Sequence, residues 1–180
     1  VAARKRFGSQ VQGGRLGVLA GAPTSVPRRP RVRSTRRALF FSSDTVGLGH
    51  LTRQLAVARR MPANVEPVFV TTSQAFRVAT QTGFAVEYLP AVDLARFERR
   101  HWESWLGESL NQIVDQYDAT CLVFDGATPH DGILETLKAN RHLSSVWIRR
   151  GLWRKQHTRH LLDRQSRFNL VIVPGDIAAA

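Results

Sequence analysis

The sequence has one cysteine in 180 residues, so an intrachain disulfide is excluded. Secreted domains often depend on disulfides, and a lone cysteine favours a reducing compartment. Runs of 18 apolar residues are also missing, which argues against a membrane-spanning helix. The chain is 43% hydrophobic, enough for one α/β domain with a real core but not for two large domains. We therefore expect a cytoplasmic protein with one main domain.

Acidic residues are absent from residues 1–37, although this segment holds 10 of the 26 Lys and Arg residues. The remainder holds 16 basic against 14 acidic residues, so the net charge of +12 belongs mainly to the N-terminal segment. The segment has no apolar periodicity and cannot bury enough surface to offset its chain entropy. We interpret residues 1–37 as a disordered basic leader. A transit peptide, an upstream extension and a nucleic-acid arm are the alternatives, and no specific nucleic-acid partner is expected.

From residue 38 onward, short apolar runs alternate with helix-length segments. The apolar runs predict strands at 38–41, 65–70, 84–88, 121–124, 145–148 and 168–173. Strands separated by helices form right-handed crossovers and a parallel sheet. The predicted fold class is α/β, with a Rossmann-like parallel sheet of about six strands and helices on both faces. The domain is expected to span residues 38–176, followed by a linker stub at 177–180.

The helices are predicted from apolar stripes and from loop signals. Residues 49–60, 74–81 and 153–166 are expected to be helical. A further helix is expected where apolar residues form a stripe from Leu106 to Tyr117. Three aromatic residues precede that stripe and are expected to form a separate apolar lid: Phe97, Trp102 and Trp105.

A polar loop with two glycines joins the first strand to the first helix. Free N–H groups and the positive end of the helix dipole collect at such a helix start, which suits a phosphate or another anion. A dinucleotide fingerprint would need glycine or alanine at position 52, where this chain has Thr52. A Walker loop would need lysine after Gly49, where this chain has His50. Neither nucleotide motif fits.

Ligands of parallel α/β sheets bind outside the carboxyl ends of the strands, near the switch point. The loops after the first, fourth and fifth predicted strands should therefore converge. By this rule we expect His50, Asp125 and Arg149 to be neighbours.

The loop from Ser43 to Arg53, with its Gly-x-Gly-His, resembles the opening loop of glycosyltransferases with the GT-B fold. The type is that of the lipid-linked muramoylpentapeptide GlcNAc transferase, glycosyltransferase family 28. The similarity continues through Val68–Thr71, Gly83–Phe84 and Asp118–Asp125 and covers residues 37–176. It implies one half of a GT-B fold, the N-terminal, acceptor-side domain.

The resemblance implies transfer of a sugar from a nucleotide-sugar donor, such as a UDP-sugar, to a hydroxyl or lipid-linked acceptor. In GT-B enzymes a second, C-terminal domain carries most donor contacts, and this sequence does not include one. We therefore expect the chain to be truncated, or completed by a separate subunit, and to be inactive alone. No cofactor and no metal are expected.

The resemblance also implies roles for individual residues. Sugar transfer needs a base near the nucleophilic oxygen, and histidine titrates near neutral pH. His50 is the expected base and Asp125 the carboxylate that orients its ring. The expected substrate-binding residues are Gly47, Leu48, Gly49, Thr52, Arg149 and Arg150.

Several alternatives remain open for the sequence. His50 could simply cap its helix, and Asp125 could be an ordinary turn residue. Asp125, His130 and Asp131 lack a spacing that defines a metal site. The basic face around His157 and His160 is expected to be solvated, with peripheral contact to an anionic membrane as a minority option. A sugar-nucleotide 2-epimerase half and a non-catalytic Rossmann-like binding module are the alternative functions.

Overall fold

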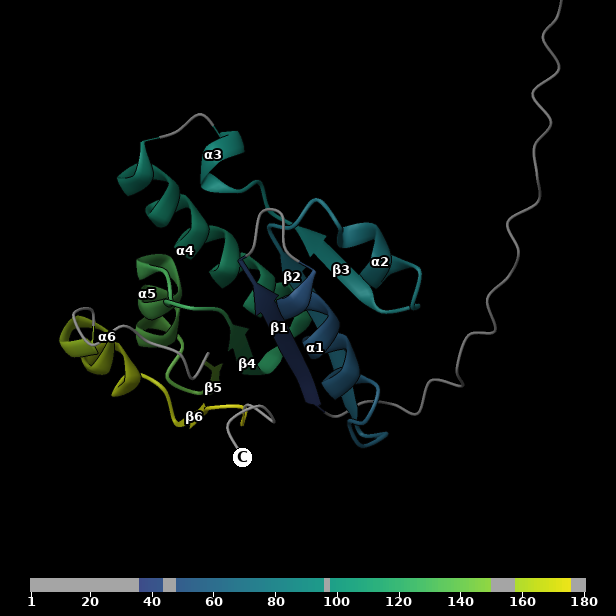
Figure 1. The fold of residues 1–180 in the computed structure, drawn as a ribbon. Helices are drawn as coiled ribbons and strands as arrows, with labels where there is room; N and C mark the ends of the chain where they lie inside the picture. The colour runs from purple at the N-terminus through teal and green to yellow at the C-terminus, as the bar shows by residue number, and fades with distance from the viewer. Residues whose placement is uncertain (1–35, 44–47, 96–97, 150–157, 176–180) are drawn as a thin grey trace, which may run out of the picture.

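The computed structural model describes residues 36–43, 48–95, 98–149 and 158–175 of the chain. Figure 1 shows the helices and strands of these residues arranged around one sheet. In chain order they are β1 (Arg36–Ser42), α1 (Gly49–Ala58), β2 (Val65–Thr71), α2 (Phe76–Thr80), β3 (Ala85–Tyr88), α3 (Val92–Ala95), α4 (Arg99–Tyr117), β4 (Ala119–Asp125), α5 (Asp131–Ala139), β5 (Ser144–Ile148), α6 (Thr158–Gln165) and β6 (Leu170–Ile172).

The six strands run parallel in one sheet, in the order β3-β2-β1-β4-β5-β6. The chain moves outward from β1 to β3 and then returns to the other side of β1 as β4. This reversal places the switch point at the carboxyl ends of β1 and β4, where doubly wound sheets bind ligands. The predicted class, a Rossmann-like parallel sheet of about six strands with helices on both faces, is confirmed.

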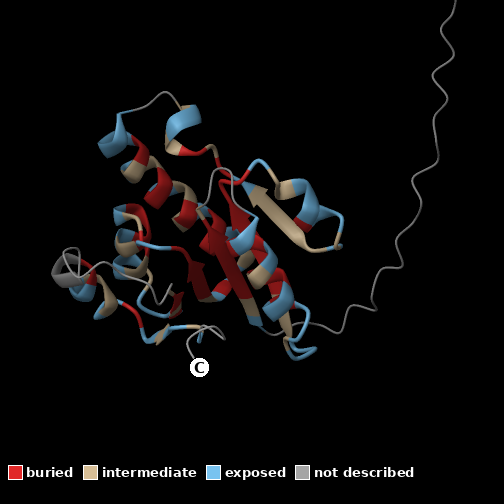
Figure 2. Ribbon diagram, viewed as in Figure 1, coloured by how far each residue is buried: buried red, intermediate tan, exposed pale blue. Residues whose placement is uncertain are grey.

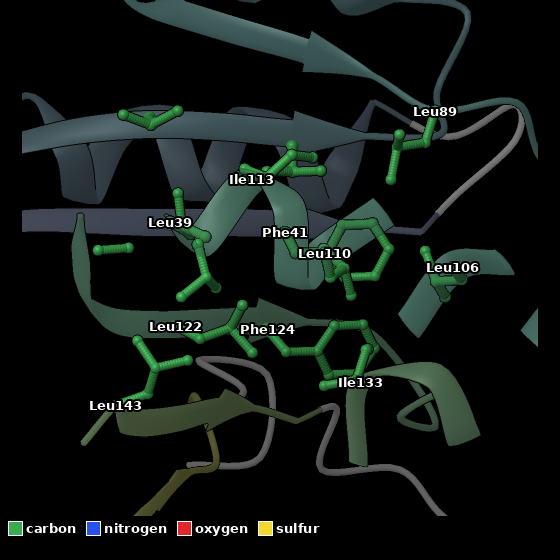
Figure 3. Packing of buried hydrophobic residues seen from close by; sticks show 14 of the residues in the cluster. Leu39, Phe41, Leu89, Leu106, Leu110, Ile113, Leu122, Phe124, Ile133 and Leu143 are labelled. Carbon is green, nitrogen blue, oxygen red and sulfur yellow. The ribbon is translucent and has the colours of Figure 1, made fainter. Parts of the chain in front are cut away.

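Side chains of β1 alternate between two buried cores, one on each face of the sheet. Leu39 and Phe41 join the core under α4 and α5, which Figure 3 shows from close by. Ala38 and Phe40 join the core under α1 and α2. The central strands are therefore buried on both faces (Figure 2), and this double burial explains why they read as continuous apolar runs.

Helix α4 begins at Arg99, well before the apolar stripe that predicted it. Trp102 is only 1% exposed and donates its indole N–H to Pro90 O at 2.9 Å. Trp105 packs against the core under α4 and α5, to which Trp102 also belongs. The prediction of a separate aromatic lid is therefore wrong for both tryptophans, and Phe97 lies outside the described residues.

Strand β1 also begins earlier than predicted, because charged side chains extend it. Arg37 Nε donates to Glu66 Oε2 on β2 at 3.0 Å, and Arg37 Nη1 donates to Tyr117 O at 2.8 Å. Most of the predicted leader, residues 1–35, lies outside the described residues, as do residues 176–180 with the linker stub. Within the described ranges, no helix has the length and apolar character needed to cross a bilayer.

Candidate active site

The last residues of three neighbouring strands form a polar row at the carboxyl edge of the sheet. Ser42 of β1 is in register with Thr71 of β2 on one side and with Asp125 of β4 on the other. Two residues earlier, the same strands carry an apolar row in the core under α1: Phe69, Phe40 and Val123. Because side chains repeat every second residue along a strand, the polar row also faces α1. Its three members are at most 1% exposed.

Helix α1 supplies the polar groups that meet this row. It is held on the sheet by the apolar side chains Leu51, Leu55 and Ala58. His50 and Gln54 are buried on the same face of the helix. Gln54 Nε2 donates to Phe41 O at 2.8 Å, which fastens α1 to the end of β1. The first turn of α1, with His50, is thereby fixed at the switch point.

His50 and Asp125 form a buried hydrogen-bonded pair, with 2.6 Å between Nδ1 and Oδ1. The side chain of His50 is 8% exposed and that of Asp125 is fully buried. Arg53, one turn further along α1, donates from Nε to Asp125 Oδ2 at 2.7 Å and from Nη2 to Oδ1. Both carboxylate oxygens are thus hydrogen-bonded, which a buried charge requires.

The partners of Asp125 indicate which nitrogen of the His50 ring carries the proton. The Asp125 oxygens accept hydrogen bonds from Arg53, so the proton between Nδ1 and Oδ1 belongs to the ring. A neutral ring protonated on Nδ1 has Nε2 as its acceptor nitrogen. This arrangement can take a proton from a hydroxyl group, as a general base with an orienting carboxylate does.

The glycine loop is described from Leu48 onward, and Gly47 lies outside the described residues. Leu48 occupies the N-cap position of α1 and is 47% exposed. Among the described residues, a methyl group at Gly49 would meet no atom within 4 Å, so there is open space on this side of the helix start. Thr52 donates its hydroxyl to Leu48 O at 2.9 Å, a bond within its own helix. The binding roles of these residues remain predictions.

Arg149 lies directly after β5, at the same edge of the sheet as Asp125. Its backbone N–H donates to Ile172 O at 2.8 Å and so continues the ladder between β5 and β6. A role for its side chain in holding an anionic group stays a prediction. Arg150 lies outside the described residues.

Asp125, His130 and Asp131 do not converge on a metal ion. Each has a different partner: His50, Glu103 and Arg164, respectively. Among the residues that the structure describes, no group of three or more His, Cys, Asp and Glu side chains could hold a metal.

A second histidine–carboxylate pair lies on the α4 side of the sheet. Glu103 Oε1 contacts His130 Nδ1 at 3.1 Å, and Glu103 Oε2 accepts the Gly132 N–H at 3.0 Å. Burial acts to raise the pKa of Glu103, but these hydrogen bonds and the nearby positive charge hold it below its ordinary value. Both oxygens thus serve to fasten the start of α5 to α4.

A groove of about 540 Å³ runs between α4 and α5, and neither His50 nor Asp125 lines it. We place the candidate site at the polar row instead. The row combines a buried histidine–carboxylate pair with the switch point of the sheet, where ligands of this fold class bind.

Arg53 and Gln54 are the site residues that the sequence analysis did not single out. Both follow His50 at helical spacing, i+3 and i+4, and this spacing places the three on one side of α1. This helical spacing can be seen in the sequence. The need of Asp125 for a second hydrogen-bonding partner cannot, because it depends on the burial of its carboxylate.

No protein-family model matches the chain, and no curated protein matches its sequence. Solved structures share its fold. MurG from Acinetobacter baumannii has a TM-score of 0.58 at 10% identity, over 79% of this chain and 42% of that chain. UDP-GlcNAc 2-epimerase from Neisseria meningitidis, bound to UDP-GlcNAc, has a TM-score of 0.51 at 11% identity, over 77% and 40%. MnaA from S. aureus, solved with UDP, has a TM-score of 0.54 at 12% identity, over 77% and 38%.

At these identities the likeness shows the fold alone. The chain is similar to one half of the GT-B fold and spans about two fifths of the length of these neighbours. The predicted resemblance is confirmed at the level of this fold, which glycosyltransferase and epimerase neighbours share.

Proposed function

We propose that this chain is the acceptor-binding half of a glycosyltransferase, which moves a sugar from a nucleotide-sugar donor to a hydroxyl acceptor. The donor is a UDP-sugar that takes its main contacts from a second domain. The acceptor is a hydroxyl compound or a lipid-linked sugar, and the latter would bring the protein to a membrane surface.

The observation that carries this proposal is the buried His50–Asp125 pair at the switch point. In the reaction, the acceptor oxygen bonds to the sugar carbon while the bond from that carbon to the diphosphate breaks. His50 Nε2 takes the proton of the acceptor hydroxyl, and Asp125 stabilises the imidazolium that forms. The open space at Gly49, beside the first N–H groups of α1, suits an anionic group of the substrate.

A sugar-nucleotide 2-epimerase is the second candidate, and the fold shared with the UDP-GlcNAc 2-epimerase from Neisseria meningitidis favours it. Such an enzyme acts on the donor alone and needs no acceptor hydroxyl. A histidine–carboxylate pair could also serve it, because moving a proton at carbon requires a positioned base.

Acceptor dependence separates the two functions. The test joins this chain to the donor-binding half of a GT-B enzyme and adds UDP-GlcNAc, with and without a lipid-linked sugar acceptor. We expect UDP release and a glycosylated acceptor only when the acceptor is present. Conversion of the donor sugar to its 2-epimer without acceptor would select the epimerase. No turnover in either mixture, with a panel of UDP-sugars, would favour a non-catalytic binding module and contradict the proposal.

A further inference from the structure

We propose that Arg53 is a positioning residue that holds the carboxylate of Asp125 so that the neutral His50 ring carries its proton on Nδ1. The inference rests on the proposed function for the role of His50, and its test requires no substrate. It starts from the three-residue group of His50, Arg53 and Asp125, in which two side chains of α1 bind one carboxylate of β4.

The guanidinium of Arg53 holds the carboxylate of Asp125 as a two-pronged fork. Nε and Nη2 donate to different oxygens, which fixes the plane of the carboxylate and directs Oδ1 at His50 Nδ1. A carboxylate held this way favours the tautomer with the proton on Nδ1. Lysine could supply the charge but not the fork.

The same guanidinium also lies beside the ring. Arg53 Nη2 is 3.1 Å from His50 Nδ1, so it contacts both atoms of the hydrogen bond between His50 and Asp125. Because both oxygens of Asp125 accept hydrogen bonds from Arg53, the proton between Oδ1 and Nδ1 belongs to the ring, and Nε2 is left as the acceptor nitrogen.

Nitrogen-15 NMR of the histidine rings tests this inference, because it shows which ring nitrogens carry protons. The chain has six histidines, and His50→Gln identifies the resonances of His50. We expect the neutral wild-type ring to carry its proton on Nδ1. In Arg53→Met this tautomer should fall by about tenfold relative to the Nε2–H tautomer, as expected for losing a hydrogen-bonded charge.

Two further variants sharpen the comparison. Arg53→Lys keeps the charge and loses the fork, so the Nε2–H tautomer should appear. Arg60→Met is the matched control, because Arg60 lies just past the end of α1 and donates to Ala56 O. It should leave the His50 signals unchanged.

An Nδ1–H form that persists in Arg53→Met would overturn the inference. If Arg53→Met does not fold, as judged from its backbone amide spectrum, Arg53→Lys decides in the same way: an unchanged ring contradicts the positioning role. These results are independent of sugar transfer. A chain that shows the expected ring changes but supports no transfer would retain the inference on Arg53 and lose the proposed function.

Discussion

At the residue scale, Asp125 is fully buried and binds His50 through one oxygen and Arg53 through both. Removing one partner from a buried charge is costly, because the charge stays desolvated while its compensation is lost. Substitutions at Asp125 are therefore expected to disturb the seating of α1 as well as the His50 ring. His50 is the better residue for separating chemistry from stability.

Tyr117 offers a second test at the residue scale. Burial, together with the hydrogen bond that it donates to Glu87, raises the pKa of Tyr117 to about 12. Because the pKa is raised in the fold, this contribution to stability is present below pH 10 and is lost as pH rises toward 12. We expect an absorbance titration to show one of the two tyrosines ionising near pH 12.

Two substitutions test whether the ionisation step near pH 12 belongs to Tyr117. Tyr117→Phe should remove it, and Glu87→Gln should move it toward pH 10, since the neighbouring carboxylate is one of its causes. Glu135→Gln is the control, because Glu135 is exposed on α5 and pairs with Lys138. A step that stays in place in Glu87→Gln would show that the negative charge of Glu87 does not raise the pKa of Tyr117.

The sequence allowed His50 and Asp125 to be placed together, because each follows a strand that its apolar run reveals. Parallel strands bring their carboxyl ends to one edge, so order along the chain becomes proximity in space. Arg53 could not be placed beside Asp125 in the same way. Its direction depends on how α1 sits across β4, which the packing of the whole helix decides.

At the scale of elements, α4 and α5 approach closely through Gly107 and Gly132. A methyl group on Gly132 would lie 2.6 Å from Glu103 O and 2.9 Å from Gly107 N, both backbone atoms of α4. Backbone atoms inside a helix cannot shift aside as the end of a flexible side chain can. The two helices must therefore move apart if Gly132 carries a side chain, and the hydrogen bond from Gly132 N–H to Glu103 would be strained.

Gly132→Ala should consequently destabilise the protein by about 1–3 kcal/mol, the usual cost of overpacking. The measurement is the free energy of unfolding in urea. Gly49→Ala is a matched control, because Gly49 also stands at the start of a helix and a methyl group there meets open space. Its effect should stay within about 0.5 kcal/mol. Equal losses in both variants would contradict the close contact of α4 and α5.

The elements themselves were predicted with unequal success, for physical reasons. The central strands were evident because burial on both faces demands continuous apolar runs. The start of α4 was not evident, because residues 99–105 mix charged side chains with tryptophans. Trp102 packs in the core under α4 and donates to Pro90 O, and no local pattern encodes these contacts.

At the scale of the whole molecule, the first 37 residues carry most of the net charge and show no apolar periodicity, whereas the core residues of the described part of the chain lie between 38 and 171. Deleting residues 1–34 should therefore leave the thermal midpoint nearly unchanged. A fall of more than about 4 °C, which corresponds to roughly 1 kcal/mol in a domain of this size, would contradict the interpretation of this segment as a leader. Calorimetry of the full and shortened chains provides the comparison.

The central claim is that His50 is the base of a sugar transfer, and one measurement addresses it directly. It compares the single-turnover rate of wild type and His50→Ala in this chain joined to a donor-binding half, with melting curves recorded for both. We expect the rate per folded molecule to fall by about 10²–10⁴ while acceptor binding changes little. A purely structural His50, which only pairs with Asp125, would instead lower stability by about 1–3 kcal/mol with turnover preserved. An unchanged rate in folded His50→Ala would contradict the catalytic role and leave only the fold.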